Sequence, residues 1–246
     1  MTVSDLLERN MGMVGFNKSS FSGVFFTFLI WCLPFGVSVA NAAETPDKVS
    51  GNATARVIKL LQDNRNTYEK KPDQFYRDVE QVIDPVIAFD EMARGVMGKY
   101  AHRASDAQIK EFTGVFRSSL IHFYSKAVLT FDSSQLSLGK VDPVSPEILK
   151  EYDSGKSRSV PVSLKIKAKD AEYSISYSMM KEGGEWKVRN IIVEGINIGI
   201  QFRNQFGEAM NRYKKVEVAI EKWPELMQQT EKSQEKELRE KGKDKS

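Results

Sequence analysis

A strand that turns directly into a helix is the feature that most constrains the fold of this chain. The run from Trp186 to Phe206 begins with the alternation of a strand, and both of its faces become apolar from Ile191 to Val193. One face is predicted to carry Trp186, Val188, Asn190 and Ile192. Glu194 and Gly195 break this period, and apolar residues then recur at helical intervals. The pattern therefore predicts a buried strand that turns sharply, at a glycine tolerant of unusual dihedral angles, into a helix that packs back on a sheet.

Alternating strands precede this run in the sequence. Apolar and polar residues alternate from Arg158 to Lys169 and again from Tyr173 to Met180, and Glu182-Gly183-Gly184 is typical of a hairpin turn. A shorter strand is expected around Leu138, and the polar stretch from Glu147 to Ser157 is interpreted as a hairpin loop. Closely joined strands of this kind favour an antiparallel sheet with one solvent-exposed face.

Helices are predicted on both sides of the strands. Ser105 and Gln108 have the spacing of a capping box at the start of a long helix. The apolar periodicity predicts helices over residues 46–68, 72–83, 86–97, 106–131, 196–213 and 216–227. A chain with helices, then an antiparallel sheet, then helices again is an α+β domain whose helices lie on the apolar face of the sheet.

The first 42 residues are predicted to be a signal peptide that is removed on export. A hydrophobic run from Phe21 to Val39, which contains the only cysteine, Cys32, is followed by the small-residue cleavage site Ala40-Asn41-Ala42. The run is also long enough for an uncleaved membrane anchor, which is the alternative. Residues 43–227 are then the folded domain, and residues 228–246 form a charged tail that is disordered or a frayed helix.

Several functional classes find no support in the composition and motifs. The net charge of +3 comes from interleaved acidic and basic residues, without the basic stripe of a nucleic-acid-binding protein. The sequence has no G-x-S-x-G motif, no Gly-rich phosphate loop after a strand and no Cys/His metal spacing. His102 is interpreted as a solvated loop residue and His122 as a rim or core residue. Glu194 is either a catalytic base or, as is more common for such a residue, the residue that closes the turn or caps the following helix.

Large apolar side chains are abundant on the predicted inner faces. Tyrosine and methionine recur on the strands, and phenylalanine and methionine recur on the helices. Such residues line the mostly apolar pockets that bind ligands, and methionine suits adaptable binding. The same composition also makes an ordinary solid core. The residue pattern alone therefore predicts an exported α+β domain and does not decide whether it contains an apolar cavity.

Two runs of the sequence resemble a known family. V-I-A-F-D-E-M-A-R-G-V-M-G-K-Y and the following R-A-S-D-A-Q-I-K-E-F, within residues 86–112, look like the first half of the MlaC-type periplasmic phospholipid carriers, also called toluene-tolerance auxiliary proteins. G-G-E-W-K-V-R-N-I-I-V-E-G-I-N-I-G-I-Q-F-R-N-Q-F, residues 183–206, resembles the most recognisable run of that family. The likeness covers about Thr54 to Trp223.

The resemblance implies a fold similar to the nuclear-transport-factor-2-like cone, in which helices wrap a curved antiparallel sheet around an apolar cavity. It implies a soluble periplasmic protein that holds phospholipid as cargo. No catalysis is implied, and neither a cofactor nor a metal is expected. It further implies a shuttle between an outer-membrane lipoprotein complex and an inner-membrane ABC transporter with an MCE-domain subunit. Such a system maintains the lipid asymmetry of the outer membrane.

Strand alternation and helical spacing select the residues expected to line that cavity. The candidate lipid-binding residues are Val96, Met97, Phe112, Phe116, Leu120, Tyr124, Val162, Leu164, Ile166, Tyr173, Ile175, Tyr177, Met179 and Ile192. In this hypothesis Phe112, Phe116 and Leu120 of the long helix face the strand residues. One alternative is a cone-fold isomerase or hydratase that uses Tyr173 or Tyr177 with a shifted pKa. The other is an interaction module with a solid core.

Overall fold

The computed structural model describes residues 44–64, 68, 70–129, 133–169 and 171–243, without the side chains of residues 124–129, 133, 231 and 233–243. The predicted signal peptide, residues 1–42, and the side chain of Tyr124 lie outside this part of the chain, so their assignments stay predictions. None of the helices in the described ranges is both long and apolar enough to cross a bilayer.

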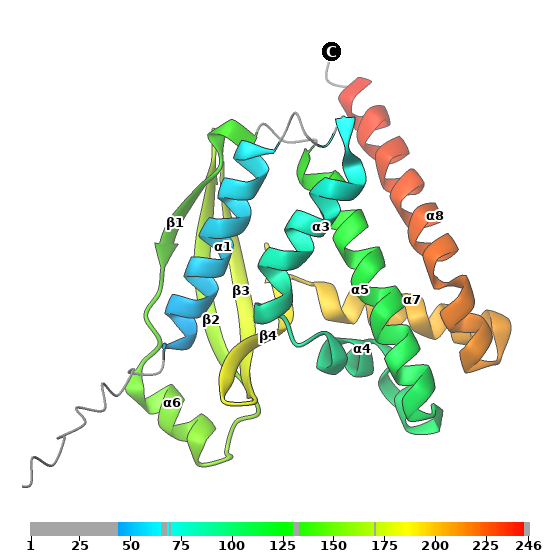
Figure 1. Ribbon diagram of the computed structural model, residues 1–246, viewed down its shortest axis with the longest axis horizontal. Helices are drawn as coiled ribbons and strands as arrows, with labels where there is room; N and C mark the ends of the chain where they lie inside the picture. The colour runs from blue at the N-terminus through cyan, green and yellow to red at the C-terminus, as the bar shows by residue number, and fades with distance from the viewer. Residues whose placement is uncertain (1–43, 65–67, 69, 130–132, 170, 244–246) are drawn as a thin grey trace, which may run out of the picture. The chain divides into compact units, whose positions relative to one another are not determined.

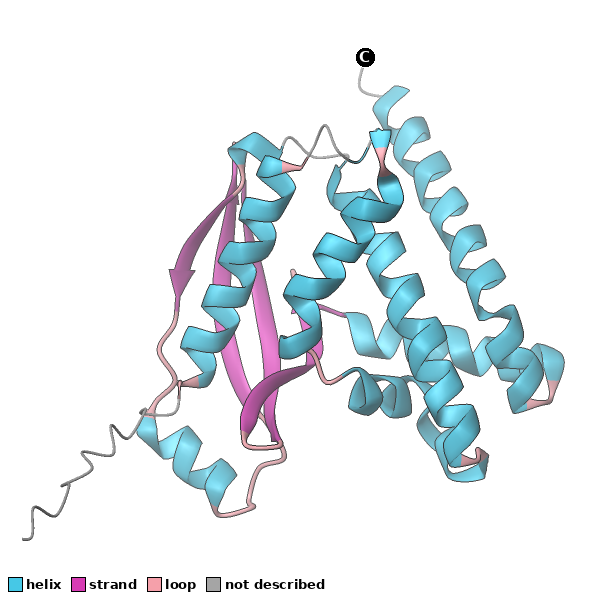
Figure 2. Ribbon diagram, in the orientation of Figure 1, coloured by secondary structure: helices cyan, strands magenta, loops and turns pink. Residues whose placement is uncertain are grey.

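Five antiparallel strands form one sheet in the order β1-β2-β3-β4-β5, as the alternation predicts (Figure 1, Figure 2). The strands are β1 (Ser137–Val141), β2 (Val160–Ala168), β3 (Ala171–Glu182), β4 (Glu185–Val193) and β5 (Ile196–Asn197). Gly183 and Gly184 close the predicted hairpin between β3 and β4, and both have the positive φ angle that glycine adopts at little cost. Neighbours in sequence are therefore neighbours in the sheet.

A short helix, α6 (Pro146–Asp153), occupies the stretch that the sequence suggested was a loop. The loop prediction for residues 147–157 is wrong over most of its length, because Ser145 and Pro146 provide a helix start. The Ser145 hydroxyl accepts a hydrogen bond from the Ile148 N–H at 3.5 Å, and Pro146 occupies the first turn, where its missing N–H costs nothing. The polar composition misled the prediction because α6 buries little of its surface.

A β-bulge in β4 changes which residues share a face. The pairs across β3 and β4 are Met179–Val188 before the bulge and Ser178–Asn190, Tyr177–Ile191, Ser176–Ile192 and Ile175–Val193 beyond it. Arg189 is the extra residue. The predicted face holds for Trp186 and Val188. It is wrong for Asn190 and Ile192, which the extra residue moves to the other side of the sheet.

Helices cover the sheet and pack on one another. They are α1 (Pro46–Asp63), α3 (Pro72–Ile83), α4 (Phe89–Met97), α5 (Asp106–Leu129), α7 (Ile198–Tyr213) and α8 (Val216–Lys243), with short 3-10 turns at Asp84–Val86, Gly98–Arg103 and Ser133–Gln135. α1 lies along the sheet and α7 contacts β4, whereas α5 and α8 lie farther from the sheet (Figure 1). Gly51 allows α1 to approach β1 closely, since a Cβ there would stand 3.3 Å from Val141. The predicted tail boundary at Gln228 falls inside α8, which is helical to Lys243.

Most of the buried apolar residues in the described chain fall into three groups. The helical core joins α4, α5, α7 and α8 through Met92, Ala93, Val96, Met97, Ile109, Phe112, Phe116, Leu120, Ile198, Phe202, Phe206, Ala209, Met210, Ala219, Ile220, Trp223 and Met227. The sheet core contains Val160, Val162, Met179, Trp186 and Val188. The α1–α3 core contains Leu61, Phe75, Val79 and Ile121. The half-buried residues Ile87 and Ile191 touch both the helical core and the sheet core, so they connect the two.

Candidate functional site

The apolar face of the sheet is the candidate site that the sequence predicts, and the strand register confirms which residues share it. The residues on this face of β2 and β3 are Val160, Val162, Leu164, Ile166, Tyr173, Ile175, Tyr177 and Met179. Ile191 and Val193 of β4 continue the same face, because they pair with Tyr177 and Ile175. Every residue predicted for the sheet wall except Ile192 therefore lies on one surface.

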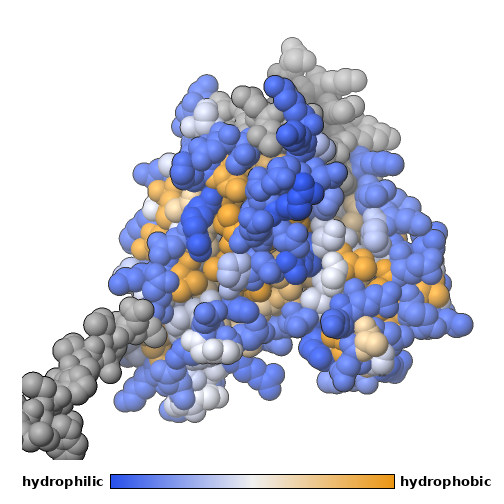
Figure 3. Space-filling view, in the orientation of Figure 1, coloured by the Kyte–Doolittle hydropathy of each residue, from blue (hydrophilic) through white to orange (hydrophobic). Residues whose placement is uncertain are grey.

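This face is filled at one end and incompletely covered at the other. Val162 and Leu164 are only 1% and 2% exposed, and Met179 is fully buried. The half-buried residues toward the β2–β3 hairpin and on β4 are Ile166, Tyr173, Ile175, Tyr177, Ile191 and Val193, which we call the open half of the sheet face. Apolar surface also remains visible between α1 and α3 in the space-filling view (Figure 3). A partly covered apolar surface therefore lies where sequence alternation placed the cavity wall.

Tyr177 marks the boundary between the filled part and the open half. Its hydroxyl lies 3.1 Å from the Thr54 hydroxyl of α1, and Thr54 itself donates to the Ser50 carbonyl at 2.8 Å. Because a threonine hydroxyl has one proton to donate, Tyr177 is the donor to Thr54. Burial raises the pKa of the Tyr177 phenol above its ordinary value, and the hydrogen bond to Thr54 offsets part of that effect. The phenol is therefore protonated at neutral pH, which does not suit a general base.

The helix residues predicted to face the sheet lie mainly elsewhere. Phe112 and Phe116 contact the Trp223 ring at centroid distances of 5.3 and 6.3 Å, and Phe116 contacts Phe202 at 5.5 Å. The helical core that holds them contains no described residue of β2 or β3. The expectation that Phe112, Phe116 and Leu120 face those strands is therefore wrong: they pack with α7 and α8. Helical spacing could not reveal this, because α5 is apolar on more than one side, with Ile121 in the α1–α3 core.

The polar residues singled out in the sequence do not form a catalytic cluster. Glu194 has φ 50°, its N–H donates to the Ser174 carbonyl at 2.9 Å, and its carboxylate accepts from the Ser174 N–H. The prediction that Glu194 closes the turn is confirmed. His122 is exposed, and its ring lies 3.8 Å from that of Tyr76. Among the described residues, no three His, Cys, Asp or Glu side chains come close enough together to hold a metal ion.

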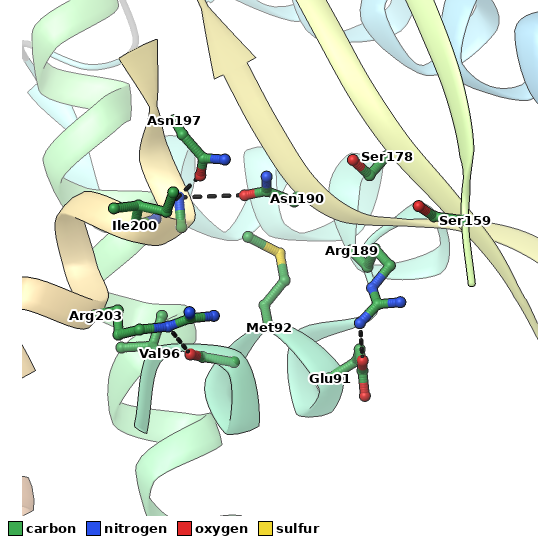
Figure 4. A pocket seen from close by; sticks show the side chains of 12 residues that line it. Glu91, Met92, Val96, Ser159, Ser178, Arg189, Asn190, Asn197, Ile200 and Arg203 are labelled. Carbon is green, nitrogen blue, oxygen red and sulfur yellow. Dashed lines mark hydrogen bonds and ion pairs between the residues drawn. The ribbon is translucent and has the colours of Figure 1, made fainter. Parts of the chain in front are cut away.

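A second, polar pocket was not anticipated from the sequence. It has a volume of about 320 Å³ and lies between α4, the bulge of β4 and the start of α7 (Figure 4). Its polar lining residues are Glu91, Ser159, Ser178, Arg189, Asn190, Asn197 and Arg203. Val96 is the one predicted site residue that lines it. Strand alternation could not reveal this pocket, because the bulge brings Arg189 and Asn190 to it.

Comparisons with known proteins agree on one family. The family model described as MlaC protein matches residues 51–225. Toluene tolerance protein ttg2D of Pseudomonas putida is 36% identical over 173 residues, which span 70% of this chain and 75% of that protein. A phospholipid-binding protein from Ralstonia solanacearum, solved in complex with a phospholipid, superposes with a TM-score of 0.64 at 18% identity, over 76% of this chain and 98% of that one. At this identity the superposition establishes the shared fold.

Proposed function

Because this chain belongs to the MlaC family, we propose that it is a periplasmic phospholipid carrier that holds acyl chains against the open half of the sheet face. One observation carries the proposal: six half-buried apolar side chains share a surface that the described helices leave incompletely covered. The phospholipid found in the solved structure of the same fold supports lipid as the cargo. No catalytic step is part of this function.

The proposed lipid-binding residues are those of the open half of the sheet face. Ile166, Tyr173, Ile175 and Tyr177 are retained from the sequence prediction, and Ile191 and Val193 replace Ile192. Val162, Leu164 and Met179 are fully packed and form the end of the site. Val96, Met97, Phe112, Phe116 and Leu120 support it from the helical core rather than from its wall.

The energetics of such a surface favour tight binding without ionic contacts. Two acyl chains bring roughly 30 methylene groups, each worth about 0.8 kcal/mol when buried. Even partial burial therefore holds a lipid firmly. Release then requires a partner that offers the chains another apolar surface. This requirement fits a carrier that exchanges lipid with an outer-membrane lipoprotein complex and with an inner-membrane ABC transporter that has an MCE-domain subunit.

The first experiment asks what the purified protein carries. Organic-solvent extraction of protein isolated from the periplasm, followed by mass spectrometry, should recover phospholipid. Replacing Ile175 with Trp places a larger side chain where an acyl chain would lie. Ile175→Trp should lower lipid recovery while the lipid-free protein keeps nearly normal stability in chemical denaturation.

The matched control is Ser163→Trp, which introduces the same side chain on the exposed face of β2. This variant should recover as much lipid as the unaltered chain. If the open half is instead solidly packed, Ile175→Trp should destabilise the protein by about 1–3 kcal/mol and leave lipid content unchanged. That result, or an unaltered protein that carries no lipid, would overturn the proposal.

A further inference from the structure

The polar pocket between α4, β4 and α7 is separate from the proposed lipid site. Ser178 and Asn190, which line it, pair with each other on the side of the sheet opposite Tyr177. Acyl chains held against the open half therefore do not reach it through the sheet. Met92 and Val96 of the helical core also line the pocket, so part of its wall is a packed layer.

Hydrogen bonds to the start of α7 fix the orientation of two amides in this pocket. The Oδ1 of Asn190 accepts from the Gly199 N–H at 3.2 Å, and the Oδ1 of Asn197 accepts from the Ile200 N–H at 3.0 Å. With both oxygens engaged, the two amides present their NH₂ groups as donors (Figure 4). The same bonds satisfy two of the free N–H groups of the α7 terminus, so these backbone groups are not what the pocket offers a ligand.

Among the described residues that line the pocket, the charges leave one cation available. Glu91 and Arg189 form an ion pair, and Arg189 also donates to the Arg158 carbonyl at 3.2 Å. The Nε of Arg203 donates to the Gly95 carbonyl at 2.7 Å, which holds the side chain along α4 and directs its Nη groups into the pocket (Figure 4). Since Glu91 is the only acid lining the pocket in the described part of the chain, Arg203 has no counter-charge among those lining residues. The lining therefore offers mainly donors, and an anion is the ligand it fits.

Exposed apolar side chains beside the pocket indicate what carries that anion. Ile196 and Ile200 are 51% and 49% exposed, and they are the two large apolar residues so exposed within the described chain. Ile200 lines the pocket itself. Protein interfaces combine an apolar centre with arginine anchors, whereas a free inorganic anion gains nothing from isoleucine.

We propose that this pocket is a docking site for a partner protein, with Arg203 and the two asparagine amides binding a carboxylate of the partner. Ile196 and Ile200 pack against an apolar residue of the partner next to that carboxylate. The bulge at Arg189 is what opens the site, because it turns Asn190 toward α7 and Arg189 toward Glu91.

The test uses the full mature chain labelled with ¹⁵N and two short probes. Acetyl-Leu-Glu-Leu-amide should produce saturable NMR shifts at Gly199, Ile200 and the Asn190 side-chain amide. Acetyl-Leu-Gln-Leu-amide, which lacks the charge, should bind at least about tenfold more weakly, as expected for loss of a charged hydrogen bond. Arg203→Gln should remove this preference, and Arg203→Lys should restore part of it.

Arg212→Gln is the matched control, because Arg212 is an exposed arginine of α7 that does not line the pocket. It should leave peptide binding unchanged, and extraction of Arg203→Gln should recover normal amounts of lipid. Equal binding of both peptides, or no shifts at these residues, would overturn the proposal. So would inorganic phosphate shifting the same resonances more strongly than the Glu peptide, or anionic phosphatidylglycerol vesicles broadening them selectively. A loss of bound lipid in Arg203→Gln would assign the pocket to the lipid site instead.

Discussion

Asn190 shows how one side chain joins the sheet to the helix that follows it. Its Oδ1 lies where it accepts from the Gly199 N–H, and a Cβ added at Gly199 would stand only 2.5 Å from that oxygen. The run from Asn190 to Gly199 in the sequence therefore encodes a close approach of α7 to β4 as well as a turn. Sequence reading identified the turn at Glu194 but had no signal for this contact, because it depends on the bulge.

This contact predicts that Gly199→Ala changes the free energy of unfolding in opposite directions with and without the Asn190 side chain. Gly199→Ala should lower the free energy of unfolding by about 1–2 kcal/mol, because the new methyl group displaces Asn190 and breaks its hydrogen bond. Alanine is otherwise better than glycine in a helix by up to about 1 kcal/mol. In an Asn190→Ala background the clash is absent, so the same substitution should stabilise the protein. Chemical denaturation of the unaltered chain, the two single variants and the double variant measures both effects. Equal destabilisation by Gly199→Ala with and without Asn190 would contradict the contact.

At the scale of elements, local patterns predicted most of the fold, although the local helix start at Ser145 and Pro146 was missed. The antiparallel sheet followed from alternation, and the hairpin at Gly183 from its turn residues. The other errors concern contacts between elements: the bulge at Arg189, and the neighbours that each side of α5 meets. A helix that is apolar on several sides does not encode which neighbour each side meets, so Phe112 and Phe116 were assigned to the wrong partner.

The capping box at the start of α5 is an element that the sequence predicted and the structure confirms. The Ser105 hydroxyl accepts from the Gln108 N–H at 3.2 Å, and the Gln108 side chain accepts from the Ser105 N–H at 2.9 Å. Ser105→Ala should lower the free energy of unfolding by about 1 kcal/mol. Ser105→Asp should retain most of the stabilisation that the cap provides. Ser118→Ala, at an exposed position within the same helix, should be neutral or slightly stabilising. Thermal and chemical denaturation distinguish the two, and identical effects would argue against a capping role.

At the scale of the whole molecule, the helical core and the open half of the sheet face differ in how completely they are packed. The helical core is rich in aromatic residues, with Trp223 fully buried among phenylalanines from α5 and α7. The open half of the sheet face lies beside this packed layer, since Ile191 and Val193 contact the helical core, and the proposal places the cargo on this side of the sheet. The proposed docking pocket lies on the opposite side of β4, which separates partner recognition from the lipid surface.

The same division predicts where the chain can be shortened. Met227 is 4% exposed in the helical core, and the Thr230 hydroxyl bonds with Gln205 of α7, so α8 contributes to the body at least that far. Beyond Lys232 the sequence contains a single large apolar residue, Leu238, which is too little to bury a surface. Truncation after Lys232 should therefore leave the melting temperature and the bound lipid unchanged. Truncation after Glu225 removes Met227 and should cost on the order of 2–5 kcal/mol, as for other large deletions from a core. A clear loss of stability or lipid in the longer chain would mean that the charged tail packs against the body.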